Sequence, residues 1–99
     1  MLAVAPPLPE LVLYTRPGCD LCDASRDSIQ SVLEDRAARG LPVPAVIERD
    51  IEADAELERA LGDLIPVIEL GDRRLQLVVS AGRIRRLLAD VLDGTARLA

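Results

Sequence analysis

Cys19 and Cys22 are the only cysteines in the 99 residues of this chain, and they lie three positions apart after the turn Pro17-Gly18. Cysteines spaced in this way at the beginning of a helix lie on one face, close enough to form a disulfide with each other. The sequence contains no histidine, which excludes Ser-His, Cys-His and His-metal chemistry and leaves thiols, carboxylates and backbone dipoles. The pair therefore predicts thiol–disulfide exchange.

The two sulfurs have different expected roles. Only the thiolate attacks a disulfide, and a free cysteine with a pKa of about 8.5 is mostly protonated at neutral pH. We expect Cys19 at the first helical position, where unpaired backbone N–H groups and the helix dipole lower its pKa, although Asp20 and Asp23 oppose this effect. Cys22, one turn further, is expected to be buried and to start as a thiol. The sequence thus predicts Cys19 as nucleophile and Cys22 as resolving thiol.

Other interpretations of the pair stay open. Cysteines also serve as small buried apolar residues, but two of them at a polar helix start are unlike core packing. A single chain supplies two thiolates where tetrahedral zinc needs four ligands, so zinc or a bridging iron–sulfur cluster would require a dimer. No metal site within one chain is predicted. A third interpretation is a non-catalytic protein-binding module.

The amino-acid composition argues against some classes of binding partner. The net charge is −5, from 12 arginines and 17 acidic residues, with no lysine, and Tyr14 is the only aromatic residue. An acidic surface without base-stacking aromatics argues against nucleic-acid binding. Residues 1–9 are apolar but interrupted by prolines, so we expect an extended arm there rather than a signal peptide or membrane span. A cytoplasmic location and one domain over residues 10–99 follow.

Periodicity along the chain predicts seven elements. They are a strand at 10–15, a helix from 19 to about 39 ended by Gly40, a strand at 45–50, a short helix at 53–61, strands at 64–70 and 73–79 joined by a Gly71-Asp72 turn, and a last helix after residue 82 ended by Gly94. The expected inward residues of the first helix are Cys22, Ile29, Val32, Leu33 and Ala37, with Leu21 and Ser25 flanking, and Arg36 on the polar side. In the short helix they are Ala53, Leu57, Ala60 and Leu61, opposite an acidic face of Glu52, Asp54, Glu56 and Glu58 that we interpret as solvated surface. Ile84, Leu87, Leu88, Val91 and Leu92 form the apolar stripe of the last helix.

The order β-α-β-α-β-β-α, with Cys-x-x-Cys after the first strand and Ile65-Pro66-Val67 opening the third, resembles the thioredoxin fold in its glutaredoxin form. The chain is similar to the small bacterial glutaredoxin-like family over roughly residues 10–93. The resemblance implies an α/β fold in which a four-stranded mixed sheet is flanked by three helices. It also implies a thiol–disulfide oxidoreductase.

The resemblance further implies substrate-binding roles for Arg16, Ile65 and Pro66. In the family the matching proline is cis and lies opposite the cysteines, so that the Ile65 backbone pairs with an extended substrate, and a basic residue stands where Arg16 does. The implied partners are a disulfide-containing protein or small-thiol substrate and a reducing thiol or reductase. No tightly bound cofactor is expected. Glutathione is one candidate reductant, but the last helix lacks the family's glutathione-gripping acid and has Arg83 there, so the electron donor stays open.

Overall fold

The computed structural model describes residues 8–93, so most of the predicted arm and the predicted stop at Gly94 lie outside it. In order, the elements are β1 (Leu11–Thr15), α1 (Asp20–Ala38), β2 (Val46–Asp50), a 3₁₀ turn (Ile51–Ala53), α2 (Ala55–Leu61), β3 (Val67–Leu70), β4 (Arg73–Leu75), α3 (Ala81–Leu88) and a π-helical turn (Ala89–Asp93). This is the predicted order β-α-β-α-β-β-α, and the fold is thioredoxin-like.

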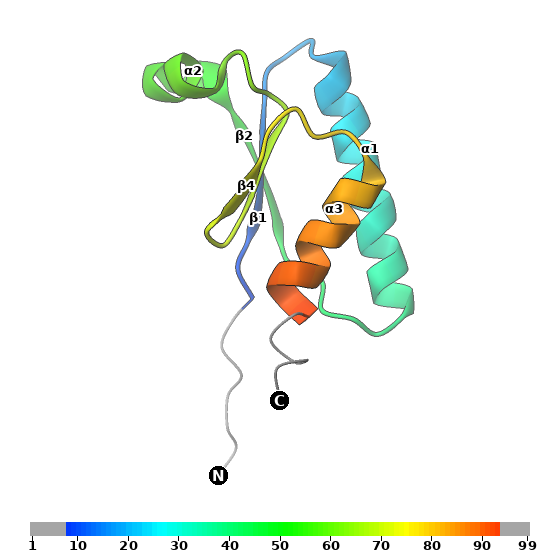
Figure 1. The fold of residues 1–99 in the computed structure, drawn as a ribbon. Helices are drawn as coiled ribbons and strands as arrows, with labels where there is room; N and C mark the ends of the chain where they lie inside the picture. The colour runs from blue at the N-terminus through cyan, green and yellow to red at the C-terminus, as the bar shows by residue number, and fades with distance from the viewer. Residues whose placement is uncertain (1–7, 94–99) are drawn as a thin grey trace.

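The four strands form one mixed sheet in the order β2-β1-β3-β4. β1 pairs in parallel with β2, with Leu13 opposite Glu48, and antiparallel with β3, with Leu13 opposite Ile68. The parallel pair requires a crossover, which α1 supplies. β3 and β4 form the predicted hairpin. In Figure 1, α1 and α3 lie together on one side of the sheet and α2 lies at one end of the other side.

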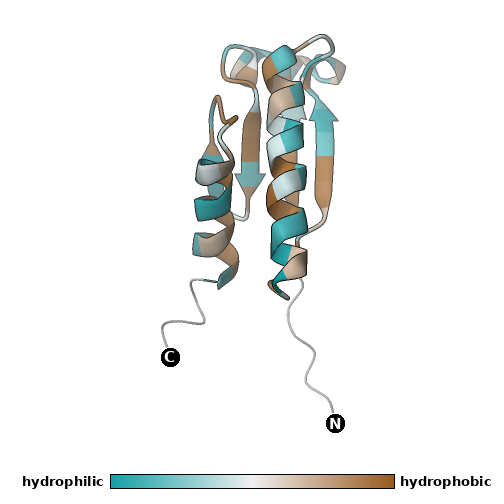
Figure 2. Cartoon of the chain, turned by 90° about the vertical axis from the view of Figure 1, so that its right-hand side faces the viewer, coloured by the Kyte–Doolittle hydropathy of each residue, from teal (hydrophilic) through white to brown (hydrophobic). Residues whose placement is uncertain are grey.

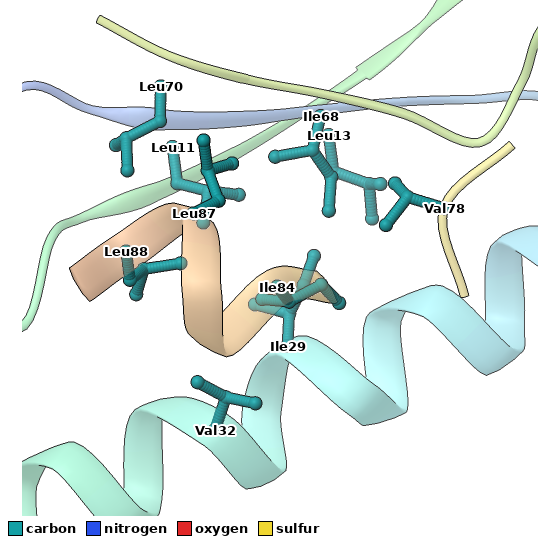
Figure 3. Packing of buried hydrophobic residues seen from close by; sticks show 10 residues of the cluster. All are labelled: Leu11, Leu13, Ile29, Val32, Ile68, Leu70, Val78, Ile84, Leu87 and Leu88. Carbon is teal, nitrogen blue, oxygen red and sulfur yellow. The ribbon is translucent and has the colours of Figure 1, made fainter. Parts of the chain in front are cut away.

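The main core lies between the sheet and the pair α1 and α3, and Figure 3 shows its side chains converging from all these elements. It consists entirely of aliphatic residues: Leu11, Leu13, Ile29, Val32, Ile68, Leu70, Val78, Ile84, Leu87 and Leu88. Figure 2 shows hydrophilic and hydrophobic residues interspersed along both helices. Burial of this aliphatic face is the main force that holds both helices on the sheet. The core therefore fixes how α1 and α3 lie on the sheet.

The beginning and end of α1 follow from local sequence. Gly18 has φ of 75° in the turn before the helix. Cys19 was predicted to be the first helical residue, but it is the N-cap, with extended backbone. The difference arises because the Cys19 side chain accepts the N–H of Cys22, which is the bond that an N-cap makes. At the other end Gly40 has φ of 71°, as the predicted stop requires.

Two residues of α1 are placed opposite to prediction. Arg36 is buried at 3% exposure, whereas Ala37 is exposed. Arg36 donates from Nε to the Pro42 carbonyl at 2.7 Å and from both Nη atoms to the Asp93 carboxylate at 3.1 and 2.6 Å. These bonds compensate for burying the guanidinium and tie the proline-rich 41–44 segment and the end of α3 to α1. Leu21, expected to flank the core, is 56% exposed.

Several predicted boundaries are also wrong. α2 begins at Ala55 because Asp54 caps it through the amides of Glu56 and Leu57. Ala53 and Ala60 are exposed, while Leu61 is buried and Leu57 half-buried. β4 ends at Leu75 rather than at residue 79, because the following residues turn back to hydrogen-bond the segment before β3.

The last helix is α-helical only to Leu88, and Ser80 caps it by accepting the N–H of Arg83. Ile84, Leu87 and Leu88 are buried as predicted, whereas Val91 and Leu92 in the π-helical turn are half-buried. Within residues 8–93, none of the helices has the length and apolar character needed to cross a membrane.

Candidate redox site at the start of α1

Cys19 and Cys22 are joined by a disulfide with Cα atoms 5.2 Å apart, which confirms that the two sulfurs meet. The two residues differ in accessibility: Cys22 is 1% exposed, whereas Cys19 is half-buried. The Cys19 Sγ accepts the Cys22 N–H at 3.0 Å. An incoming thiolate can therefore approach Cys19, and the N-cap position provides that sulfur with a backbone donor.

The segment Leu64-Ile65-Pro66 lies against the same small core as the disulfide. This second cluster contains Tyr14, Cys22, Ile51, Leu61, Ile65 and Val67, with Cys19 and Leu64 packed against it. The Ile65–Pro66 peptide bond is cis, as the resemblance implied. The Leu64 and Pro66 carbonyls accept from Leu77 and Val78 at 2.9 and 3.0 Å.

Ile65 lies between Leu64 and Pro66 but differs from them in its backbone hydrogen bonding. Among the described residues, its own N–H and C=O form no backbone hydrogen bond. Backbone groups without partners next to this disulfide form a short free edge to which an extended peptide can pair. The structure thus brings Cys19, Cys22, Ile65 and Pro66 together at one site.

Arg16 is held on the neighbouring acidic surface. Its guanidinium lies 3.5 Å from Glu52 and 3.8 Å from Glu58, and its side chain is 34% exposed. Because Arg59 also contacts Glu56, three of the four carboxylates of the predicted acidic face are paired within the chain. Arg16 ties the end of β1 to α2, and these partners compete with any role in holding a substrate.

Arg26 forms a denser set of contacts about two turns into α1. It donates bidentately to Glu48 on β2 at 2.8 and 2.6 Å and to Asp23 at 2.8 Å, while Thr15 donates to Glu48 at 3.0 Å. The Arg26 guanidinium, helped by Thr15, lowers the pKa of Glu48. Because Asp23 is paired with a cation, its negative charge opposes a Cys19 thiolate less than the sequence indicates.

The Arg26–Glu48 contact predicts a loss of stability in acid. Since the pKa of Glu48 is lower in the folded chain, its contribution is complete above the unfolded value of about 4.3 and disappears as the pH falls through the folded value. We expect Arg26→Gln to return the Glu48 pKa toward the unfolded value, measured by NMR titration of the side-chain carboxyl carbon. Arg59→Gln, which removes only the exposed contact with Glu56, is the control. An unchanged Glu48 titration in Arg26→Gln would contradict this assignment.

Two exposed leucines adjoin residues of the cluster that contains Cys22. Leu21, between the cysteines, is 56% exposed, and Leu77, bonded to Leu64, is 55% exposed with φ of 50°. A leucine in the left-handed region costs about 1–2 kcal/mol, and such positions concentrate at functional sites. A groove of about 370 Å³ lies elsewhere, between α1 and β2, and neither cysteine lines it. The candidate site is thus an open surface with apolar residues beside it.

The described residues contain no cluster of three or more His, Cys, Asp or Glu side chains arranged to hold a metal ion. Both sulfurs of the only cysteine pair are bonded to each other. Metal binding through two chains stays a prediction.

A mixed sheet of this order, with a Cys-x-x-Cys disulfide capping the first helix and a cis-proline beside it, defines a protein of thioredoxin-like fold with a candidate redox site. The profile of the glutaredoxin-like domain family (DUF836) matches residues 10–91, and the chain belongs to that family.

A solved structure agrees with this membership. The X-ray structure of Northeast Structural Genomics target protein XcR50 from X. campestris is 33% identical, with a TM-score of 0.64, covering 79% of this chain and 93% of that one. No curated protein matches the chain.

Sequence reasoning missed two features of α1. The Arg26–Glu48 contact joins a residue of α1 to one of β2, 22 positions apart, and no local pattern in the sequence indicated it. Ser25 had been expected only to flank the buried face of α1, but it is completely buried. Its signal was the three-residue spacing from Cys22.

Proposed function

We propose that this protein is a glutaredoxin-like thiol–disulfide oxidoreductase with a dithiol mechanism, Cys19 being the nucleophile and Cys22 the resolving thiol. The observation that carries the proposal is the asymmetry of the pair: the sulfur that caps α1 is half-exposed, whereas its partner is 1% exposed. Only the Cys19 sulfur is accessible enough to contact a bulky substrate. Family membership supports thiol redox chemistry without identifying a reaction.

The proposed cycle begins with the reduced protein. The Cys19 thiolate, stabilised by the Cys22 amide and the start of α1, attacks one sulfur of a substrate disulfide, and the other substrate sulfur leaves as a thiolate. The Cys22 thiolate then attacks Cys19 Sγ, and the remaining substrate sulfur leaves. The protein is left with the Cys19–Cys22 disulfide, and two electrons from an external thiol reduce it again.

The substrate class that fits this surface is a disulfide-containing protein. The free N–H and C=O of Ile65 suit pairing with an extended segment beside Pro66, and Leu21 and Leu77 add apolar area. A small thiol disulfide remains the second substrate class. Arg16 would contribute to substrate binding only by leaving Glu52 and Glu58.

The electron donor is proposed as an external thiol or reductase, with no tightly bound cofactor and a cytoplasmic location. Glutathione is one candidate. Arg83, at the start of α3, extends its guanidinium to the Gln76 carbonyl at 3.4 Å, so this position presents a cation where an acid would grip the glutathione amine. This charge favours a reductase as donor.

The test is reduction of a protein disulfide and of a small-molecule disulfide, each with glutathione plus its reductase and with thioredoxin reductase. We expect turnover of the protein disulfide, faster with thioredoxin reductase. Turnover with neither donor would contradict the proposal.

A non-catalytic binding module is the alternative that this surface also permits, and thiolate absorbance separates the two. We expect the pKa of Cys19 in the reduced protein below the free value of about 8.5. An unshifted value together with absent turnover would favour the module. Stoichiometric zinc or a coloured cluster in the purified protein would favour metal binding instead.

A further inference from the structure

Ser25 holds a buried hydroxyl that the fold leaves without a partner. It is 0% exposed, and among the described residues its Oγ is the one buried side-chain nitrogen or oxygen atom that makes no hydrogen bond. Buried polar groups are nearly always paired, because the donor or acceptor has lost water. The oxidised protein therefore keeps an unfavourable group where an alanine would fit.

The position of Ser25 points to a partner. It lies three residues after Cys22 in α1, and both residues belong to the buried face of that helix. Side chains three apart on a helix are neighbours, with Cβ atoms about 5–6 Å apart. The Ser25 and Cys22 side chains are therefore neighbours on the buried face of α1.

The other groups around Cys22 do not offer a free donor. Its cluster is otherwise apolar apart from Tyr14, whose hydroxyl donates to Glu69 at 2.9 Å. Thr15, the other buried hydroxyl of this kind among residues 8–93, donates to Glu48. In the oxidised protein Cys22 Sγ is bonded to Cys19 and is a weak acceptor, whereas a thiolate at the same place is a strong one.

We propose that Ser25 donates a hydrogen bond to the Cys22 thiolate when the disulfide opens, and that it thereby sets the reduction potential of the pair. The effect of this hydrogen bond on the resolving step, in which the Cys22 thiolate attacks Cys19 Sγ, rests on the proposed function. The bond itself does not, because any reductant that opens the disulfide creates the same thiolate.

The step balances as follows. The thiolate of a reductant attacks Cys19 Sγ and forms a new disulfide with it, the bond between Cys19 and Cys22 breaks, and its electron pair goes to Cys22 Sγ. Ser25 donates to that sulfur and holds it as a thiolate in the reduced protein, in place of the thiol expected from the sequence. In the reverse direction the Cys22 thiolate attacks Cys19 Sγ of the mixed disulfide and the other thiolate leaves.

Ser25→Ala tests the proposal through the equilibrium between disulfide and dithiol. The protein is equilibrated with dithiothreitol of defined redox state, and the fraction reduced is measured by alkylation and mass spectrometry. We expect the equilibrium constant to shift about tenfold toward the disulfide, which is about 30 mV more negative. Ser28→Ala, the same change one turn further along α1, is the matched control and should shift it less than about twofold.

Melting temperatures of the oxidised and reduced proteins distinguish a hydrogen bond to the Cys22 thiolate from a packing role of Ser25. Removal of an unpartnered hydroxyl should raise the melting temperature of the oxidised protein by about 4 °C, while the reduced protein gains nothing. Ser25→Thr keeps a hydroxyl and should restore most of the potential. Equal changes in both redox states, or an unchanged potential in Ser25→Ala, would overturn the proposal. Absence of turnover in the unsubstituted protein would instead contradict the proposed function and leave the Ser25 measurement interpretable.

Discussion

Replacement of Cys19 by serine is expected to lower disulfide reduction by at least about a thousandfold. The described residues contain no other sulfur that is accessible, because Cys22 is 1% exposed beneath Ile65 and its neighbours. A serine hydroxyl at the N-cap keeps the helix start intact but cannot attack a disulfide at neutral pH. The measurement is the initial rate of protein-disulfide reduction with dithiothreitol as donor.

Replacement of Cys22 by serine should give a different result. Cys19 still attacks, but no second thiol releases the substrate, so a mixed disulfide accumulates and is visible as an increase in mass that a reductant reverses. The Ser28→Ala variant is the control for loss of a small side chain in α1. Equal loss of rate in both cysteine variants, with no trapped species, would contradict the assigned roles.

The second large effect is on stability, through Asp93. Asp93→Ala leaves the Arg36 guanidinium, which is 3% exposed, without its bidentate partner. Loss of one member of a buried ion pair costs about 3 kcal/mol or more. We expect the free energy of unfolding, measured with urea, to fall by about that amount.

The control for this substitution is Asp90→Ala in the same turn. Asp90 lies 3.9 Å from Arg73, and both side chains are about half exposed. Exposed pairs contribute about 0–1 kcal/mol. Equal losses in the two variants would show that Asp93 acts through helix propensity and not through Arg36.

The sequence predicted the element order, the parallel pairing of the first two strands and the meeting of Cys19 and Cys22. These features depend on local periodicity and on a short spacing in the chain. Ile84, Leu87 and Leu88 were found buried for the same reason. The cis bond at Pro66 was predicted only through family resemblance, because base rates favour trans.

The wrong predictions concern residues whose burial or secondary structure depends on partners far away in the sequence. Arg36 was assigned to solvent because a lone arginine on a helix usually lies there, but Asp93, 57 residues later, makes its burial possible. β4 was predicted to be too long. The residues after Leu75 hydrogen-bond to Leu64 and Pro66 instead of continuing the pairing with β3. The contacts of Arg16 with Glu52 and Glu58 also join residues far apart in the sequence, and its substrate-binding role stays a prediction.

The disulfide spans only three positions of the chain. A cross-link that closes so small a loop restricts the unfolded chain little, by about 2 kcal/mol on a loop-entropy estimate, and the aliphatic core under α1 and α3 does not depend on it. The proposed redox cycle therefore opens and closes the disulfide without unfolding the domain. This distinguishes the pair from the structural disulfides of small secreted domains, which those domains need to stay folded.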